Sequence, residues 1–364
     1  MTLAMLTDAH YFVQQAIHTG CFPGAVLLVA KKKKIVHFEA YGWANLFDRT
    51  PMTRDTVFDL ASLTKPLATT MAFLELARMG LVNPKQPLVS LLPQFSGTEK
   101  ADIRIQDFLQ HTSGLPAWRP YFRVLAKHDL VSRPSVLKQL LVKEPLIQPP
   151  GEAVVYSDLG FMILAWVVEA MTDFPLGRFV SQGLYRSLDL ENLLFFPSID
   201  PIPEKIPCAA TELCPRRGIL LNRVVHDDNA YTITRLQGHA GLFGAAMPIF
   251  QLLTAFLDAY RQLPGSRLSH QWARYFADRR GRSGRVLGFD VPSRHHSASG
   301  NYFSINTIGH LGFTGTSFWM DLKRAVIVIL CTNRVHPSRY NNQIRAFRPQ
   351  LHDMVMKQLG YAMN

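Results

Sequence analysis

The chain has 364 residues, of which 48% are hydrophobic and 18% are charged, and its formal net charge is +12. This composition is typical of a globular protein with an ample core, built as roughly two to three domains or one large two-lobed unit. A charge of this size could attract nucleic acid or other anionic partners. The basic residues are spread out, however, and no nucleic-acid motif or aromatic–basic stripe is present, so we expect no nucleic-acid binding.

The cysteines are scattered and include no C-x-x-C pair, so we expect free thiols, no bound metal and no cofactor. The longest apolar run, LGFMILAWVV, is far too short to cross a membrane. The first twenty residues lack Lys and Arg and carry Asp8, which predicts an amphipathic helix rather than a secretory signal. We therefore expect a soluble, cytoplasmic protein with reduced thiols at Cys21, Cys208, Cys214 and Cys331.

The elements that follow the first helix begin with a hairpin. The apolar stretches GAVLLVA and IVHFEAYG predict strands over residues 25–30 and 35–42. Lys31–Lys34 lies between them and reads as the solvated tip. The stretch PLATTMAFLELARMG then predicts a helix that starts near Ser62 and ends at Gly80, a natural C-cap.

The rest of the chain is mostly helical until its last strands. YSDLGFMILAWVVEAM is the strongest internal helix, and MPIFQLLTAFLDAYRQL is another. The Arg- and Gly-rich segment 267–296 gives no clear assignment. Near the end, TSFWMDL and AVIVILCTN predict two strands separated by Lys-Arg, and a closing helix follows over residues 347–359.

Strands at both ends of the chain, with helices between them, predict an α+β fold with a discontinuous architecture. We expect residues 1–60 and 296–364 to form an antiparallel sheet covered by terminal helices. Residues 61–295 are expected to form a mainly helical lobe. Ligands favour such lobe interfaces, so the site is expected between the two parts.

Ser62 stands three residues before Lys65, at the start of the predicted helix. A serine hydroxyl becomes a good nucleophile when a neighbour takes its proton, and a lysine can do so if burial lowers its pKa. Positions i and i+3 of a helix share a face, so the two side chains could touch. Lys65 has apolar and small neighbours, and Pro66 fits only the first helical turn, which sets the helix start near Ser62.

The same spacing occurs at Ser135 and Lys138, in RPSVLKQLL. Serine is a favoured residue at helix starts, so either serine could be an ordinary N-cap. Ser135 follows a proline, and Lys138 is expected on the wet face of an amphipathic helix. The sequence therefore favours Ser62 as the nucleophile.

Two later segments add to the Ser-x-x-Lys pattern. Tyr156 and Asp158 precede the long apolar helix, and His310-Leu311-Gly312 precedes the last strands. Ser-x-x-Lys, Tyr-x-Asn and Lys-Thr-Gly, in that order, mark the penicillin-recognising serine hydrolases. The chain resembles their class C beta-lactamase-like branch, which includes esterases, D-aminopeptidases and carboxypeptidases. The stretches FPGAVLLVA, LQHTSGLP, VVHDDNAY and GHAGLFG extend the resemblance over most of the chain.

The resemblance implies the beta-lactamase/transpeptidase-like fold and a role for each matching residue. Ser62 would be acylated, and Lys65 would help to remove its proton. Tyr156 would relay that proton to the leaving group and later help to activate water. The backbone N–H groups of Ser62 and Phe313 would form the oxyanion hole.

Two departures from the family pattern concern substrate binding. His310 and Leu311 stand where relatives have the lysine and threonine that hold a substrate carboxylate. A histidine near its reference pKa of about 6.5 is mostly neutral at pH 7, so beta-lactam turnover should be poor and should gain from protonation of His310. Asp158 replaces an asparagine, and it could attract a cationic substrate group or pair with Lys65. Asp158, His310 and Gly312 are the expected substrate-binding residues.

The remaining histidine motifs are expected to be structural. His111, in LQHTSGLP, reads as a loop-stabilising residue, and the VVHDDNAY segment as a loop beside the cleft rather than a metal site. GHAGLFG supplies glycines for close backbone approach, with a structural His239.

The predicted function is that of a serine hydrolase acting on small carboxylic esters, with no cofactor and with an open oligomeric state. One alternative is a D-amino-acid peptidase or amidase, or a weak beta-lactamase. Another alternative is a non-catalytic binding protein on the same scaffold, although the intact set of Ser62, Lys65 and Tyr156 argues against it.

Overall fold

The computed structural model describes residues 6–197, 201–233, 237–278, 284–293 and 296–363. Its main sheet has the order β3-β2-β1-β11-β10-β9, and all neighbouring strands are antiparallel. The two central strands come from opposite ends of the sequence, with Ala25 opposite Thr332 and Lys31 opposite Val326. The strands are β1 (Gly24–Lys31), β2 (Lys34–Asn45), β3 (Thr50–Pro51), β9 (Thr307–Leu311), β10 (Ser317–Asp321) and β11 (Val326–Thr332).

The predicted hairpin and the last two predicted strands are confirmed as β1–β2 and β10–β11. Lys32 and Lys33 form the hairpin tip with φ values of +50° and +66°, the left-handed conformation that tight hairpin turns require. Strand β9 was not predicted, and we expected His310 in the segment ahead of the strands. Strand β9 is short and has Gly309 at its centre, so its sequence shows only a weak strand pattern.

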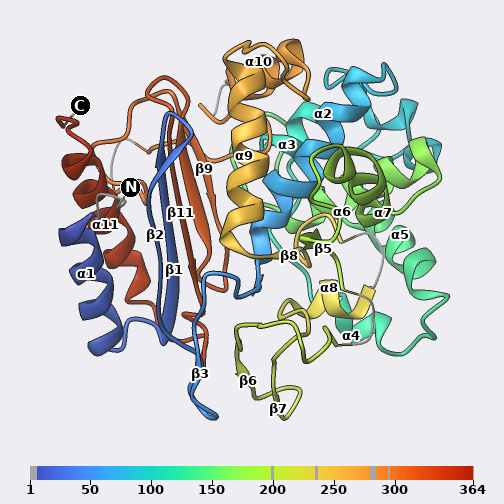
Figure 1. Ribbon diagram of the computed structural model, residues 1–364. Helices are drawn as coiled ribbons and strands as arrows, with labels where there is room; N and C mark the ends of the chain where they lie inside the picture. Colours follow the sequence, from blue (N-terminus) through green and yellow to red (C-terminus); the bar gives the residue numbers. More distant parts are fainter. Residues whose placement is uncertain (1–5, 198–200, 234–236, 279–283, 294–295, 364) are drawn as a thin grey trace.

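Helices from the two chain ends cover one face of the sheet (Figure 1). α1 (Thr7–His18) and α11 (Ile344–Gln358) lie side by side, and Phe12 stacks on Phe347 with 4.9 Å between ring centroids. The expectation of a sheet built from both chain ends and flanked by terminal helices is therefore confirmed. The opposite face packs against α9 (Ala246–Tyr260), which belongs to the middle of the sequence.

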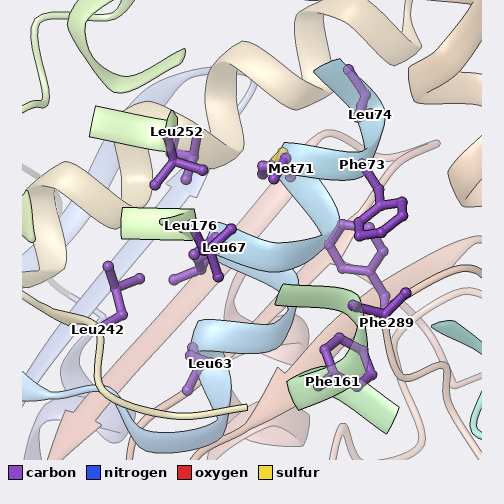
Figure 2. Close-up of a cluster of buried hydrophobic side chains, with 14 of the residues drawn as sticks. Leu63, Leu67, Met71, Phe73, Leu74, Phe161, Leu176, Leu242, Leu252 and Phe289 are labelled. Atoms are coloured by element: carbon purple, nitrogen blue, oxygen red, sulfur yellow. The ribbon is translucent and has the colours of Figure 1, made fainter. Parts of the chain in front are cut away.

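The middle of the chain forms the helical part of the molecule, as predicted. The strongest predicted helix is α6 (Asp158–Thr172), and its apolar residues face the start of α2 (Met71–Arg78) in the core. Figure 2 shows Leu67 and Met71 among the side chains of this cluster, with Phe161 nearby. The remaining helices are α3 (Ile105–Leu109), α4 (Phe122–Leu125), α5 (Arg133–Lys143), α7 (Leu176–Val180), α8 (Asp228–Ile233) and α10 (His270–Asp278).

One hydrophobic core joins the sheet to the helices. The same cluster contains Val26 and Ile329 of the central strands together with Phe161 of α6. Two small sheets complete the architecture, and one of them, β4-β8-β5, carries the chain into the turn that holds Ser62. These strands are β4 (Phe58–Asp59), β5 (Leu194–Phe195), β6 (Leu213–Cys214), β7 (Ile219–Leu220) and β8 (Phe243–Gly244).

The single helix predicted from Ser62 to Gly80 is wrong in its first half. Ala61–Leu63 forms a 3₁₀ turn, Lys65–Thr70 forms a π-helical turn, and the α-helix begins at Met71. Pro66 has no N–H to donate, which disfavours regular α-helical bonding at this point. Wide π turns of this kind often occur at functional sites.

Among the described residues, no single helix has the length and apolar character needed to cross a membrane. α6 together with the bent continuation Leu176–Tyr185 reaches those thresholds as a pair, by length and composition alone.

Candidate active site

The fold brings most of the predicted site residues to one cavity of about 360 Å³. Ser62, Tyr156, Asp158 and Phe313 line it. They come from the turn after β4, from the loop and first residue of α6, and from the loop after β9. Residues from three distant parts of the sequence therefore meet around Ser62, because β9 packs against the turn that carries this serine.

Lys65 lies beneath Ser62 with a side chain that is 0% exposed. Its Nζ donates to Ser62 Oγ at 3.1 Å and to Asp158 Oδ1 at 2.7 Å. A third bond, of 3.0 Å, goes to the backbone carbonyl of His239. The ammonium is thus held by three acceptors, one of which is the predicted nucleophile.

Asp158 decides the charge state of Lys65. Burial lowers the pKa of Lys65, but the carboxylate of Asp158 and the nearby Tyr156 outweigh burial and leave that pKa above its ordinary value. We expected burial to lower the pKa, and the net direction is the opposite. Lys65 is therefore an ammonium in the resting enzyme. It forms an ion pair with Asp158, which was one of our two expectations for Asp158.

Tyr156 places its ring 4.7 Å from Lys65 Nζ. Its hydroxyl is buried and has no hydrogen-bond partner among the described residues. Burial raises the pKa of Tyr156, and the positive charge of Lys65 only partly opposes this. The resting side chain is a neutral phenol whose hydroxyl remains available to a reacting group.

Two buried histidines flank Tyr156. The ring of His111 lies 4.4 Å from that of Tyr156, and the ring of His310 lies 5.9 Å away. His111 Nδ1 accepts the backbone N–H of Ser157 at 3.0 Å, so it orders the loop before α6 as expected. Burial lowers the pKa of both rings, in the case of His310 to about 4.

His310 and Gly312 occupy positions behind the cavity wall. His310 is 2% exposed, and neither residue is among those that line the cavity. Its Nδ1 lies 2.9 Å from the carbonyl of Leu311. The expectation that His310 titrates near pH 6.5 and then holds a substrate carboxylate is wrong on charge, because the ring is neutral above about pH 4.

The two predicted oxyanion donors lie at the cavity. Ser62 and Phe313 both line it, and among the described residues the Phe313 N–H has no hydrogen-bond partner. The neighbouring Gly312 N–H is bonded to the Thr316 carbonyl, and the Phe313 carbonyl accepts from Arg334 Nε at 2.8 Å. These bonds fix the loop that carries the Phe313 donor at the cavity wall.

The VVHDDNAY segment lines the cavity opposite the Ser62 turn, which agrees with a loop beside the cleft. Asp227 Oδ1 accepts from His239 Nε2 at 3.0 Å and from Ala230 N–H at 2.7 Å. Burial raises the pKa of Asp227, but its bonds to His239 and Ala230 outweigh that effect and hold it well below its usual range. Asp227 is therefore a fixed negative charge, and it orients the histidine whose carbonyl holds Lys65.

Two other charged side chains that line the cavity, Asp228 and Arg339, pair with residues outside its lining. Asp228 binds the guanidinium groups of Arg216 and Arg217, and Arg339 binds Glu212. Among the described residues, no group of three or more His, Cys, Asp or Glu side chains is arranged to hold a metal ion. The chemistry that the site offers is that of a serine, a lysine and a tyrosine.

Sequence reasoning missed how Ser62 is presented. Ala61, directly before it, has φ of +46°, a left-handed conformation that costs energy for alanine. The side chain of Asp59 accepts the N–H of Ala61 at 2.8 Å. An aspartate two residues before a strained position is a weak turn signal, and the hydrophobic pattern around it gives no hint of this contact.

Comparison with known proteins places the chain in a family. The family model described as Beta-lactamase matches residues 11–351. A Bacillus subtilis (strain 168) protein named N-acetylmuramyl-L-alanine amidase is 32% identical over 91% of this chain and 81% of its own length. An Escherichia coli (strain K12) protein named "Putative D-alanyl-D-alanine carboxypeptidase" is 29% identical over 91% of this chain and 82% of its own length.

Solved structures share the fold at lower identity. EstCE1, named as a hydrolase with promiscuous acyltransferase activity, has a TM-score of 0.72 and 22% identity, over 94% of this chain and 98% of that one. Simvastatin synthase (LovD) from Aspergillus terreus has a TM-score of 0.75 and 17% identity, over 98% of each chain. The fold and the site thus define a serine hydrolase of the penicillin-binding-protein-like class. The chain belongs to the Beta-lactamase family.

Proposed function

We propose that this protein hydrolyses small, uncharged carboxylic esters through an acyl-enzyme formed on Ser62. One observation carries the proposal. The hydroxyl of Ser62 accepts a hydrogen bond of 3.1 Å from the buried Lys65. Ser62 lines a cavity that is also lined by Phe313, the residue of the second predicted oxyanion donor. A nucleophile, a proton acceptor and two oxyanion donors are the parts that acyl transfer needs.

The proton path follows from the contacts of Lys65. When Ser62 Oγ attacks the ester carbonyl, its proton moves to Lys65 Nζ, which must first release one of its own. Asp158 Oδ1, 2.7 Å from Nζ, is the bonded anion that can take that proton. The carbonyl electron pair moves to oxygen, where the N–H groups of Ser62 and Phe313 stabilise it.

Tyr156 serves the leaving group in this proposal. Its unpartnered hydroxyl donates a proton to the departing alkoxide and regains one from the nearby ammonium of Lys65, which recovers its own from Asp158. A water molecule then enters, loses a proton along the reverse route and releases the acid from Ser62. The charge distribution is then that of the starting enzyme.

The charges near Ser62 favour an uncharged acyl substrate. The carboxylates of Asp158 and Asp227 line the cavity, whereas His310, which replaces the family's lysine, is neutral and buried. A substrate carboxylate would meet like charges beside the nucleophile and no lysine on β9. Beta-lactams and acidic peptides are therefore expected to be poor substrates.

Amide cleavage is the second candidate function. The two curated relatives named above carry the names of an amidase and a carboxypeptidase, and both align with nine-tenths of this chain. An amine leaves more slowly than an alkoxide unless it is protonated, and Tyr156 is placed to donate that proton. Substrate comparison separates the two functions.

The test is intact-protein mass spectrometry after exposure to a fluorophosphonate, a penicillin, p-nitrophenyl butyrate and a D-alanyl amide. We expect covalent fluorophosphonate at Ser62 and the fastest turnover with the ester. Ser62→Ala should abolish both. Ser135→Ala is the matched control, because Ser135 is exposed on α5 and Lys138 is paired with Glu169 instead. Labelling at Ser135, or ester turnover by Ser62→Ala, would contradict the assignment.

A further inference from the structure

Asp59 is a buried carboxylate that catalysis at Ser62 does not use. It is 2% exposed, and no Lys or Arg side chain among the described residues forms an ion pair with it. A buried carboxylate without a cation is costly to keep, so it needs compensating hydrogen bonds. Such bonds come from backbone groups on different sides of the active-site cavity.

The first bond reaches the nucleophile turn. Asp59 Oδ1 accepts the N–H of Ala61 at 2.8 Å, and Ala61 is the left-handed residue directly before Ser62. An aspartate that accepts the N–H two residues later stabilises such turns. Thr64 supports the same turn by donating to the Ala61 carbonyl at 2.6 Å.

The other bonds reach the two remaining walls. Asp59 Oδ2 accepts the N–H of His226 at 2.7 Å, at the start of the loop whose Asp227 lines the cavity. The backbone carbonyl of Asp59 accepts the hydroxyl of Thr314 at 2.7 Å, next to the oxyanion donor Phe313. Asp59 thus connects the turn that carries Ser62, the loop of His226 and Asp227, and the loop of Phe313 and Thr314.

We propose that Asp59 is a positioning residue that sets the spacing between Ser62, the N–H group of Phe313 and the Asp227 loop. It touches no reacting atom and acts through the backbone N–H groups of Ala61 and His226 and the hydroxyl of Thr314. The inference rests on the proposed acylation of Ser62. Because misplacement of a reacting group by about 1 Å can reduce a rate about a hundredfold, loss of this connection should lower kcat more than it raises KM.

The first variant is Asp59→Asn, which keeps the size of the side chain but turns an NH₂ group toward one of the two backbone N–H donors. We expect kcat for p-nitrophenyl butyrate, and the rate of fluorophosphonate labelling at Ser62, to fall about ten- to a hundredfold with little change in KM. Asp107→Asn is the matched control. Asp107 also accepts a backbone N–H, that of Arg104 at the start of α3, but no residue of this segment lines the cavity. Its kcat should stay at the wild-type level.

Ala61→Gly in the Asp59→Asn background tests the positioning role itself. Glycine adopts the left-handed conformation without strain, so the double variant should regain part of the lost kcat. Because glycine also removes the strain of the left-handed residue from the whole fold, kcat is compared per folded enzyme in every variant. Thermal unfolding of every variant shows whether a rate loss reflects only unfolded protein.

If Asp59→Asn does not fold, Thr314→Val tests the positioning role of Asp59 instead. It removes the hydroxyl that ties the Phe313 loop to Asp59 and leaves the carboxylate intact, and it should also lower kcat at an unchanged unfolding temperature. Wild-type kcat in the folded variants, or a kcat that falls only with the folded fraction, would overturn the inference. If the wild-type enzyme is not labelled at Ser62, the proposed function fails instead, so the two failures are distinguishable.

Discussion

At the scale of single residues, Asp158 determines how Lys65 is charged. The carboxylate lies 2.7 Å from Nζ and holds the pKa of Lys65 above its ordinary value, whereas burial alone would lower it. Lys65, the proposed serine-activating base, is therefore one half of an ion pair.

Replacement of Asp158 by asparagine should move the pH dependence of the reaction. Without the carboxylate, burial dominates and the pKa of Lys65 falls, so the free amine is present at lower pH. The rising limb of kcat/KM against pH should shift to lower pH in Asp158→Asn. Asp129→Asn, a change at a fully exposed carboxylate, should leave the limb in place. An unmoved limb in Asp158→Asn would show that Asp158 does not control Lys65.

His310 gives a second prediction at this scale. Because the pKa of His310 is lowered to about 4, its charge does not change between about pH 5 and pH 8. His310→Gln should therefore leave the shape of the pH–rate profile unchanged across that range, even if the rate itself falls. The measurement is kcat/KM for p-nitrophenyl butyrate at several pH values. The loss of a titration near pH 6.5 in the variant would contradict a neutral histidine.

At the scale of secondary-structure elements, the contact between β9 and the nucleophile turn depends on Gly312. A Cβ atom there would lie 2.1 Å from Thr316 Oγ1, 2.7 Å from the Leu60 carbonyl and 2.9 Å from Leu63 Cδ1. Such distances force the strand away from the turn. Phe313, the proposed oxyanion donor, follows directly and would move with it.

Gly312→Ala should accordingly reduce both stability and turnover. We expect a loss of about 1–3 kcal/mol in the free energy of unfolding, as for other overpacked sites, together with a lower kcat. Gly183→Ala is the control, because nothing lies within 4 Å of its added Cβ and its φ is not in the left-handed region. Urea denaturation and ester kinetics measure the two effects. A stable Gly312→Ala enzyme with full kcat would show that this contact is not tight.

The elements also show where sequence reasoning succeeds and fails. Strands β1, β2, β10 and β11 were predictable because their apolar runs are bounded by a lysine turn or a charged pair. The start of α2 was not predictable, because Pro66 and the contacts of Asp59 and Thr64 change the conformation of the turns that precede α2. The candidate site residues Ser62, Lys65 and Tyr156 were predicted from motifs, and the fold brings them together. Asp59 and the carbonyl of His239 act through backbone groups, and they emerge only when distant segments meet.

At the scale of the whole molecule, a buried ion pair connects the segment around Glu212 to the segment after β11. Glu212 is 1% exposed and lies between Arg339 and His226. Burial raises the pKa of Glu212, but its bonds to His226 and Arg339 outweigh burial and lower it to about 2. A carboxyl with a lowered pKa stabilises the fold above its unfolded pKa, near 4.5, and this stabilisation disappears as the pH falls toward 2.

Glu212→Gln should therefore destabilise the protein at neutral pH, and its effect on the free energy of unfolding should be smaller in acid. We expect a loss of about 1.5–3 kcal/mol at pH 7, the usual contribution of charge-assisted bonds. The difference from wild type should shrink between about pH 4.5 and pH 2, as measured by thermal unfolding. Asp189→Asn, which breaks an exposed pair with Arg267, should change stability by less than about 0.5 kcal/mol. A difference that stays constant with pH would contradict the lowered pKa.

The pairing of β1 with β11 has a consequence for biosynthesis. The β1–β2 hairpin is made well before β11, the strand that covers the other edge of β1, because the whole helical part of the chain lies between them. Until then, an apolar edge from Ala25 to Ala30 has no partner, and unpaired edges of this kind promote aggregation. Closing so long a loop is also slow. The nascent chain therefore carries this exposed edge until residues 326–332 are made, and any fragment that lacks them keeps it permanently.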